Sequence, residues 1–331
     1  MILIVGLMAS VASGAVDPRQ IRFDTMQPTD TLIKTMRGIV GKVNEDLLRS
    51  GIADPSGRVY FVDGNKSTAG NGSSWDDAFN TLSAAMAASH ADIAVSAYRK
   101  WAARNTIFVI ADGITEDITK LAQKTDIIGL GSNDAFNGLA KITGSWIIPD
   151  TTSYMGCRFY NMYFTDSGAT PIWDLDTQNG IEFHNCRFEA TALTTIGLQL
   201  EECNRIVVNK CLFTMFGTSR AFATACLVVV QDTDPAYEIT IANSRFVTDH
   251  IGIDWNETAT YDCWIRDNYF LTDGMCVDAE DTVGLMVVEN RMVTTLEPAD
   301  NTSNDFNIAY AIRNMVTGAS SSLMIPTFSD D

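Results

Sequence analysis

The stretch IEFHNCRF at residues 181–188 is one of a set of eight-residue segments that recur through the middle of the chain and decide its fold. Each segment begins with two apolar residues separated by one position, continues through a polar step, and ends on Phe or Met. The members are CRFYNMYF (157–164), IEFHNCRF (181–188), IVVNKCLF (206–213), ITIANSRF (239–246), CWIRDNYF (263–270) and LMVVENRM (285–292). Strand-like segments that recur about every 24 residues predict a solenoid, in which each unit buries its apolar face against its neighbours.

The segment also predicts the path of the chain within one unit. Ile181 and Phe183 alternate with polar residues, so they point to one face of a strand. Asn185 marks a bend, because Asn tolerates left-handed backbone and can hydrogen-bond to its own chain. Phe188 then re-enters the core. Equivalent bends are expected at Asn161, Lys210, Asn243, Asp267 and Glu289, and an interior column is expected from Phe164, Phe188, Phe213, Phe246, Phe270 and Met292.

A second strand is predicted later in each unit, where a further apolar run follows. These runs are IGLQL (196–200), CLVVV (226–230), IGI (251–253) and MCVDA (275–279). One interval is longer than the others and contains FGTSRAFATA (216–225), which is expected to loop out from the solenoid.

The segment before the repeats resembles the beginning of a known solenoid family. Residues 58–93 combine a strand from Val59 to Val62, a loop rich in Gly, Asn and Ser, and apolar residues at helical spacing, namely Trp75, Phe79, Leu82 and Met86. This combination resembles the N-terminal cap of pectate-lyase-like right-handed β-helices, and residues 106–118, 125–132 and 140–146 resemble the first coils of that family. A cap covers the core and the strand edges that an open solenoid end would expose.

The predicted fold is therefore all-β, a right-handed parallel β-helix (solenoid) with an N-terminal capping helix and an N-terminal attachment arm. The expected divisions are an arm with an amphipathic helix (1–55), a capping strand, loop and helix (56–105), the β-helix (106–316) and a C-terminal tail (317–331).

The arm carries an apolar stripe at helical spacing, which predicts an interface. The stripe consists of Leu32, Met36, Ile39, Val43 and Leu47. It forms either a helical neck between subunits or a helix packed on the end of its own solenoid. The initial run MILIVGLMASVASGAV resembles a signal peptide but has no basic residue before its apolar part, so an uncleaved arm is the favoured interpretation. The run is too short to span a bilayer.

Composition limits the classes of partner. The chain has 23 Lys and Arg against 41 Asp and Glu, and its formal charge of -18 repels nucleic acid and anionic membranes. Neither nucleic acid nor a membrane is therefore expected as a partner. The seven cysteines include no Cys-x-x-Cys pair and several fall within the repeated segments, which indicates buried thiols, with a disulfide or a metal site as the alternative.

An acidic residue recurs five positions before several of the repeated segments. Stacked coils would bring these acids to one outer flank, and the resemblance implies that enzymes of the family use such a flank. Lyases bind calcium through carboxylates and use a basic residue to remove a proton, and related hydrolases use paired acids. If the protein is an enzyme, its candidate catalytic residues are Asp176, Glu201, Asp234, Asp254, Asp278 and Glu280, with calcium as the candidate cofactor. The alternative is a set of solvated turn acids with no metal or other cofactor.

The functional hypothesis rests on the fold that the resemblance implies. The Asn-Thr-Asp, Gly-His-Gly and Arg-Ile-Lys motifs of the related hydrolases are absent. A β-helix on an attachment arm resembles the structural proteins of bacteriophage virions, namely tail spikes, head fibres and capsid decoration proteins, and that resemblance implies a homotrimer. The expected partners are other virion proteins, contacted through residues 1–55, and a host glycan. The alternative function is a polysaccharide lyase or glycoside hydrolase acting on acidic or cell-surface glycans, and the alternative location is secreted.

Overall fold

A computed structural model describes most of the repeat region. The described residues are 57–94, 103–110, 112–131, 140–151, 154–166, 168, 171–190, 196–215, 222–230, 235–256, 259–279, 283–294, 299–300, 310–312 and 314–318. The chain divides into two units, Met1–Asp54 and Pro55–Asp331, and all described residues belong to the second. The predicted interface residues Leu32, Met36, Ile39, Val43 and Leu47 lie outside the described residues.

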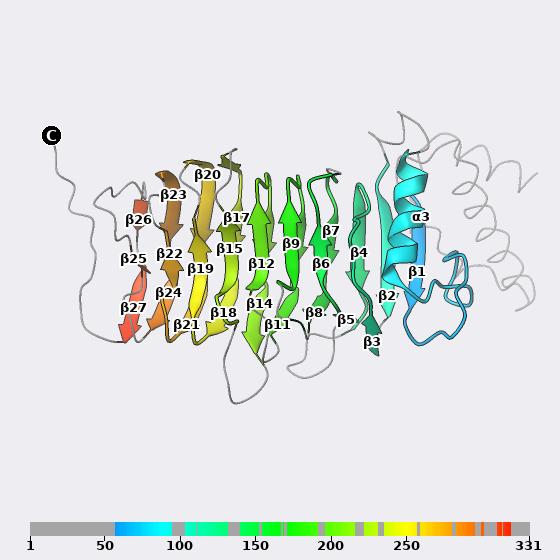
Figure 1. Cartoon of the computed structure of the whole chain (residues 1–331), viewed down its shortest axis with the longest axis horizontal. Helices are drawn as coiled ribbons and strands as arrows, with labels where there is room; N and C mark the ends of the chain where they lie inside the picture. Colours follow the sequence, from blue (N-terminus) through cyan, green and yellow to red (C-terminus); the bar gives the residue numbers. More distant parts are fainter. Residues whose placement is uncertain are drawn as a thin grey trace, which may run out of the picture. The chain divides into compact units, whose positions relative to one another are not determined.

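The described residues form three parallel sheets, whose strands follow one another along the solenoid in Figure 1. Sheet A contains β1 (Val59–Asp63), β2 (Asn105–Ile110), β4 (Thr125–Gly129), β7 (Arg158–Tyr160), β10 (Glu182–His184), β13 (Val207–Asn209), β17 (Thr240–Ala242), β20 (Ala259–Arg266), β23 (Val283–Val288) and β26 (Tyr310–Ile312), and the short β16 (Ala236–Tyr237) pairs with β20. Sheet B contains β3 (Asp112–Thr115), β5 (Ala140–Thr143), β8 (Met162–Thr165), β11 (Arg187–Ala190), β14 (Leu212–Met215), β18 (Arg245–Thr248), β21 (Tyr269–Thr272), β24 (Arg291–Thr294) and β27 (Met315–Gly318). Sheet C contains β6 (Trp146–Ile148), β9 (Trp173–Asp176), β12 (Ile196–Glu201), β15 (Ala225–Val230), β19 (Ile251–Trp255), β22 (Val277–Asp278) and β25 (Ala299–Asp300).

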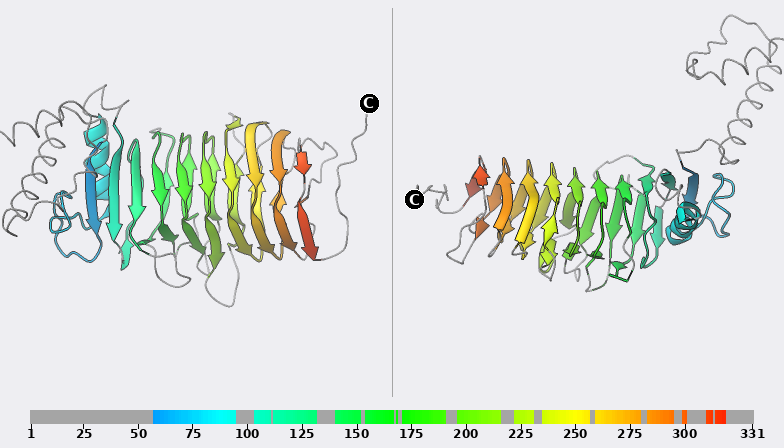
Figure 2. Two further views of the ribbon diagram at one scale, coloured as in Figure 1. Left: turned by 180° about the vertical axis from the view of Figure 1, so that it is seen from behind. Right: turned by 90° about the horizontal axis from the view of Figure 1, so that it is seen from above.

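Consecutive strands of the chain belong to different sheets, and this order defines the fold. β7, β8 and β9 lie in sheets A, B and C, and β10 then returns to sheet A and pairs in parallel with β7. The views in Figure 2 show the strands of successive coils side by side along the solenoid. The predicted right-handed parallel β-helix is confirmed. Crossover connections between parallel strands of one sheet are almost always right-handed.

The predicted interior column is confirmed along sheet B. Strand pairing places Phe164, Phe188, Phe213, Phe246, Phe270 and Met292 opposite one another in successive coils. The five phenylalanines are fully buried, and their neighbouring ring centres lie 5.3, 4.5, 4.9 and 4.9 Å apart. Aromatic stacking thus continues from coil to coil through the core.

The predicted bends are also confirmed. Between sheets A and B the chain passes through left-handed backbone at Asn161, Asn185, Lys210, Asn243, Asp267 and Glu289, with φ values of 55, 52, 56, 52, 57 and 56°. Each of these residues turns the chain between two strands that both point their apolar side chains inward. The same backbone conformation therefore recurs at this corner in every one of these coils.

A buried asparagine ladder follows these bends in the later coils, and the sequence reasoning missed it. The Asn290 side chain accepts a hydrogen bond from the Asn268 backbone N–H at 3.0 Å and donates one to the Ile265 carbonyl at 2.9 Å. Asn314 binds the Asn290 backbone N–H in the same way, at 2.8 Å. Because buried backbone groups need partners, the ladder satisfies groups that the sharp corner leaves unpaired.

The predicted capping helix is present but shorter than the apolar spacing indicated. Helix α3 spans Leu82–Ala94, and Glu116 accepts hydrogen bonds from the Leu82 and Ser83 backbone N–H groups at its start. Phe79 is not helical, because its backbone pairs with that of β1 through hydrogen bonds with Phe61 and Asp63. Among the described residues, no helix is long and apolar enough to cross a membrane.

The cysteines are buried and free, as the buried-thiol interpretation predicts. Burial raises the pKa of Cys157 and of Cys203 to about 12. These side chains therefore act as small apolar groups in the core.

Truncation in the phenylalanine column should be costly. Phe213→Ala should lower the free energy of unfolding by about 3 to 5 kcal/mol, because the rings above and below cannot close the cavity. The matched control is Leu212→Ala, since Leu212 lies on the outer face of the same strand and is half-buried. Urea unfolding followed by circular dichroism measures both, and an equal loss in the two variants would contradict the assignment.

Candidate functional site

Two of the predicted acids meet on the outer face of sheet C. Asp176 of β9 lies opposite Glu201 of β12, and Asp174 lies opposite Gln199. Thr177 Oγ1 donates a hydrogen bond to Asp176 Oδ1 at 2.8 Å, and Gln199 Nε2 donates one to Asp174 Oδ1 at 3.2 Å. Asp174 was not among the predicted site residues, although it lies two positions before Asp176 and so shares its face of the strand.

The environment of Asp174 raises the pKa of its carboxyl group. Burial and then the negative charge of Asp176 raise the pKa of Asp174, and the hydrogen bond from Gln199 partly opposes them. A carboxyl group of raised pKa beside a second carboxylate is one arrangement that can support general acid chemistry. The pair of Asp174 and Asp176, together with Glu201 opposite Asp176 in the next coil, is called the acid pair site below.

The predicted stripe does not continue through the next coils as one row. Glu201 is followed in register by Val230 of β15, so Asp234 is not its counterpart. Asp254 lies opposite Asp278, and Asp278 lies opposite Asp300. Their counterpart in β15 is Val228, whereas the counterpart of Glu201 is Val230. Asp234 and Glu280 lie outside the described residues. The valines of β15 therefore separate the acid pair site from the later aspartates.

The described residues do not by themselves make a calcium site. Calcium takes six to eight oxygen ligands, from carboxylates, carbonyls and water. Within the described ranges, no group of three or more His, Cys, Asp or Glu side chains is placed to hold a metal ion. Asp174 Oδ1 already accepts a hydrogen bond from Gln199.

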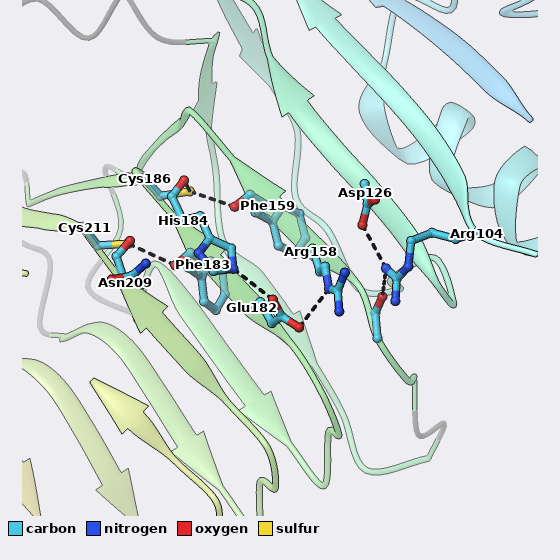
Figure 3. A network of polar contacts seen from close by, with 11 residues as sticks. Arg104, Asp126, Arg158, Phe159, Glu182, Phe183, His184, Cys186, Asn209 and Cys211 are labelled. Atoms are coloured by element: carbon cyan, nitrogen blue, oxygen red, sulfur yellow. Dashed lines mark hydrogen bonds and ion pairs between the residues drawn. The ribbon is translucent and has the colours of Figure 1, made fainter. Parts of the chain in front are cut away.

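A second polar cluster lies on the outer face of sheet A, and the sequence reasoning did not identify it. Glu182 bridges two neighbours, with Oε1 2.8 Å from Arg158 Nε and Oε2 2.9 Å from His184 Nε2 (Figure 3). The His184 ring stacks on Tyr160 of the previous coil with centres 5.0 Å apart. The only signal in the sequence was the placement of these residues on the outward positions of the repeated segments.

The same cluster extends to the first coils. Arg104 Nη1 lies 2.8 Å from Asp126 Oδ1 and donates a hydrogen bond to the Gly156 carbonyl at 2.8 Å (Figure 3). In register, Asp126 lies opposite Arg158, and Arg158 lies opposite Glu182. Charges therefore alternate in sign from coil to coil along this part of sheet A.

The neighbours of Glu182 lower the pKa of its carboxyl group. The hydrogen bond with His184 is the largest influence and lowers the pKa of Glu182; the positive charge and hydrogen bond of Arg158 add to it, while burial opposes them. Burial and the negative charge of Asp126 raise the pKa of Tyr160. The cluster therefore presents fixed charges and a neutral phenol.

A hollow of about 330 Å³ adjoins this cluster at the corner between sheets C and A. Gly156 and Gly180 form part of its lining, with φ values of 72 and 67°, and Arg158 and Glu182 contribute side chains. Arg205 and Glu238, also in the lining, form an ion pair with a distance of 2.8 Å. The hollow is thus open and carries charged side chains of both signs.

An exposed aromatic pair lies along the same corner. Tyr237 and Tyr261 are 42% and 54% exposed and stack with ring centres 5.1 Å apart. Backbone bridges join Met155, Asn179, Asn204 and Tyr237 in successive coils, so the tyrosines continue the row that borders the hollow. Exposed tyrosine rings beside charged hydrogen-bonding groups suit the binding of a ligand with both apolar and hydroxyl surfaces.

Comparison with known proteins adds little to this description. No protein-family model matches the chain, and no curated protein matches it. Among solved structures, the chain is similar to pectate lyase Pel9A with a TM-score of 0.40 and 14% sequence identity, over 82% of this chain and 79% of that one. The fold is defined by the strand pairing of this chain.

The charge cluster on sheet A should make stability depend on pH. Because the folded-state pKa of Glu182 is lowered, its carboxylate stabilises the fold above the ordinary Glu pKa of about 4.3, and this stabilisation disappears as the pH falls through the folded-state value. Glu182→Gln should therefore cost about 1 kcal/mol at neutral pH and almost nothing in acid.

Urea unfolding at a series of pH values measures this difference. Glu238→Gln is the matched control, because Glu238 forms an exposed ion pair and should cost less. A Glu182→Gln cost that stays constant from neutral to acid pH would show that the carboxylate charge is not responsible.

Proposed function

We propose that the protein is a structural protein of a bacteriophage virion, such as a tail spike, head fibre or capsid decoration protein. In this proposal the β-helix is a rigid body, and residues 1–55 attach it to another virion protein. The observation that carries the proposal is the continuous interior of the solenoid. Phenylalanine rings and buried asparagines stack from coil to coil, which favours a stiff shaft over a body that must open and close.

The cap supports the assignment of the first 55 residues as an arm. Helix α3 packs against β1, β2 and β4, where Leu82, Met86 and Ile93 are buried. The N-terminal end of the solenoid is therefore covered by residues that follow the arm. An apolar stripe that is not needed to close the fold is available for attachment to another protein.

The outer surface supports a host glycan as a further partner. The hollow at the corner of sheets C and A combines Arg158, Glu182, Arg205 and Glu238 with the exposed Tyr237 and Tyr261 nearby. Such a surface offers stacking platforms and charged hydrogen-bonding groups to a saccharide. A homotrimer is the assembly that we propose for the shaft, by resemblance to virion spikes.

Deletion of residues 1–55 tests the attachment. The shortened protein should give the circular dichroism of a folded β-protein, because the cap remains, but it should no longer be incorporated into particles. Mass spectrometry of purified particles should find the full-length chain at a fixed copy number and the shortened chain at background. Incorporation of the shortened chain at the full copy number would place the attachment surface on the β-helix.

The alternative function is a polysaccharide lyase or glycoside hydrolase, acting as a free or secreted enzyme, and the acid pair site favours it. There Asp174 is the candidate acid and Asp176 or Glu201 the candidate base or nucleophile, because the pKa of Asp174 is raised beside a second carboxylate.

Assays for unsaturated products and for new reducing ends, on acidic and neutral polysaccharides, test the enzymatic alternative. If it holds, Asp174→Asn and Glu201→Gln should each lower the rate about 100-fold or more, and Asp267→Asn at the corner between sheets A and B should leave it unchanged. Absence of both products from a panel of acidic and neutral glycans would count against the enzyme.

A further inference from the structure

The outer face of sheet B carries the same three-residue arrangement twice. In one row of strand pairing, Lys141, Tyr163 and Arg187 occupy successive coils, and later in the same row Arg245, Tyr269 and Arg291 do so. Each tyrosine ring lies between two cations. The first ring is 5.2 Å from Lys141 Nζ and 5.0 Å from Arg187 Cζ, and the second is 5.3 Å from Arg245 Cζ and 5.5 Å from Arg291 Cζ. We call them the first and the second sandwich.

The first sandwich holds a carboxylate of the chain itself. Glu189 follows Arg187 by two residues on the same face of β11 and forms an ion pair with it. Burial raises the pKa of Tyr163, and the charge of Glu189 and its hydrogen bond with Tyr163 add to this effect. The side chains of Arg187 and Glu189 are each only 12% exposed. Two cations around a phenol therefore form a place that accepts a carboxylate.

The second sandwich has no such carboxylate among the described residues. Val293 follows Arg291 by two residues, the position that Glu189 has relative to Arg187, and Leu271 and Val247 are its neighbours in the same row. Arg245 and Arg291 are exposed, and within the described part of the chain neither forms an ion pair. The second sandwich therefore places two exposed guanidinium groups beside an apolar row, in a chain of formal charge -18.

We propose that the second sandwich is a carboxylate-binding site and that its occupant is the segment LMIPTFSDD, residues 323–331 of the same chain. Asp330 and Asp331 supply the carboxylates for Arg245 and Arg291, as Glu189 does for Arg187. Leu323, Ile325 and Phe328 supply apolar side chains for the row of Val247, Leu271 and Val293. The proposal does not depend on the function of the protein.

The position of the segment in the chain fits this site. β27 ends at Gly318, and it belongs to sheet B, one strand beyond Arg291 and three strands beyond Arg245. Three strand spacings amount to about 14 Å. Residues 319–331, which lie outside the described residues, can span up to about 43 Å when extended. The chain is therefore long enough to return along the outer face of sheet B and reach both arginines.

A carbohydrate fits this site less well than a polypeptide does. Sugars bind to proteins through the open faces of aromatic rings, but both faces of the Tyr269 ring are covered by guanidinium groups. The neighbouring row is aliphatic, and aliphatic side chains pack well on it. A segment that combines apolar residues with two acids matches both parts of the surface.

Amide hydrogen exchange of the full-length chain, read by mass spectrometry on peptides from residues 319–331, tests the proposal. In the wild type these amides should exchange about tenfold or more slowly than unstructured peptide. The double variants Arg245→Gln/Arg291→Gln and Asp330→Asn/Asp331→Asn should both lose that protection. The matched control Arg266→Gln removes an exposed arginine of β20 in sheet A and should keep it.

Charge exchange gives a stricter test of the contact. Arg291→Glu should abolish protection, and addition of Asp330→Lys/Asp331→Lys in the same chain should restore it in part. Circular dichroism verifies that each variant is folded, which is expected because both arginines are exposed.

Three results would overturn the proposal. The first is exchange of residues 319–331 at the unstructured rate in the wild type. The second is protection that survives in Arg245→Gln/Arg291→Gln. The third is protection that rises with protein concentration, because the segment would then come from a second copy.

Discussion

Parallel backbone pairing between neighbouring coils is the constraint on which the rest of the structure depends. Because each residue of a strand lies opposite one residue of the coil before and one of the coil after, every position in a coil becomes a row along the solenoid. A side chain therefore has its counterparts in the two adjacent coils about 4.8 Å away. Apolar rows such as Phe188 and Phe213 gain from this proximity, because their rings stack with centres 4.5 Å apart.

Like charges at that distance repel, and the rows differ in whether they contain such contacts. On sheet C Asp176 lies opposite Glu201 and Asp254 lies opposite Asp278, whereas other rows avoid them. On sheet A the solution is alternation, with Asp126, Arg158 and Glu182 opposite one another in turn. On sheet C Asp174 meets the neutral Gln199, but burial and the charge of its neighbour Asp176 still raise its pKa. On sheet B the solution is insertion of a tyrosine between two cations. The chemistry of each outer face thus follows from how its row separates or pairs its charges.

The sequence predicted correctly those features that depend on a connection of constant length between two strands. Sheets A and B are joined by a tight corner at Asn185 and at each equivalent residue, so counting along the repeated segments placed the bends and the phenylalanine column correctly. The acid stripe failed because the connection from sheet C to sheet A varies. It spans residues 177–181 and 202–206 in two coils but 231–239 in the next, so counting back from sheet A gave Asp234 although Val230 follows Glu201.

The remaining omissions have a common cause, which is that a single position in one unit does not reveal its row. In earlier coils the position of the asparagine ladder is occupied by Cys186, Cys211 and Ser244, and Asn268 is the first asparagine at that position. Before the coils are aligned, these residues therefore look unrelated. Arg158, Glu182 and His184 likewise resemble ordinary solvated residues of separate strands. The two sandwiches of sheet B are visible only when residues more than twenty positions apart are placed in register. In a solenoid, a site is therefore formed by residues in register from successive coils. Its prediction from sequence requires that the register be predicted correctly.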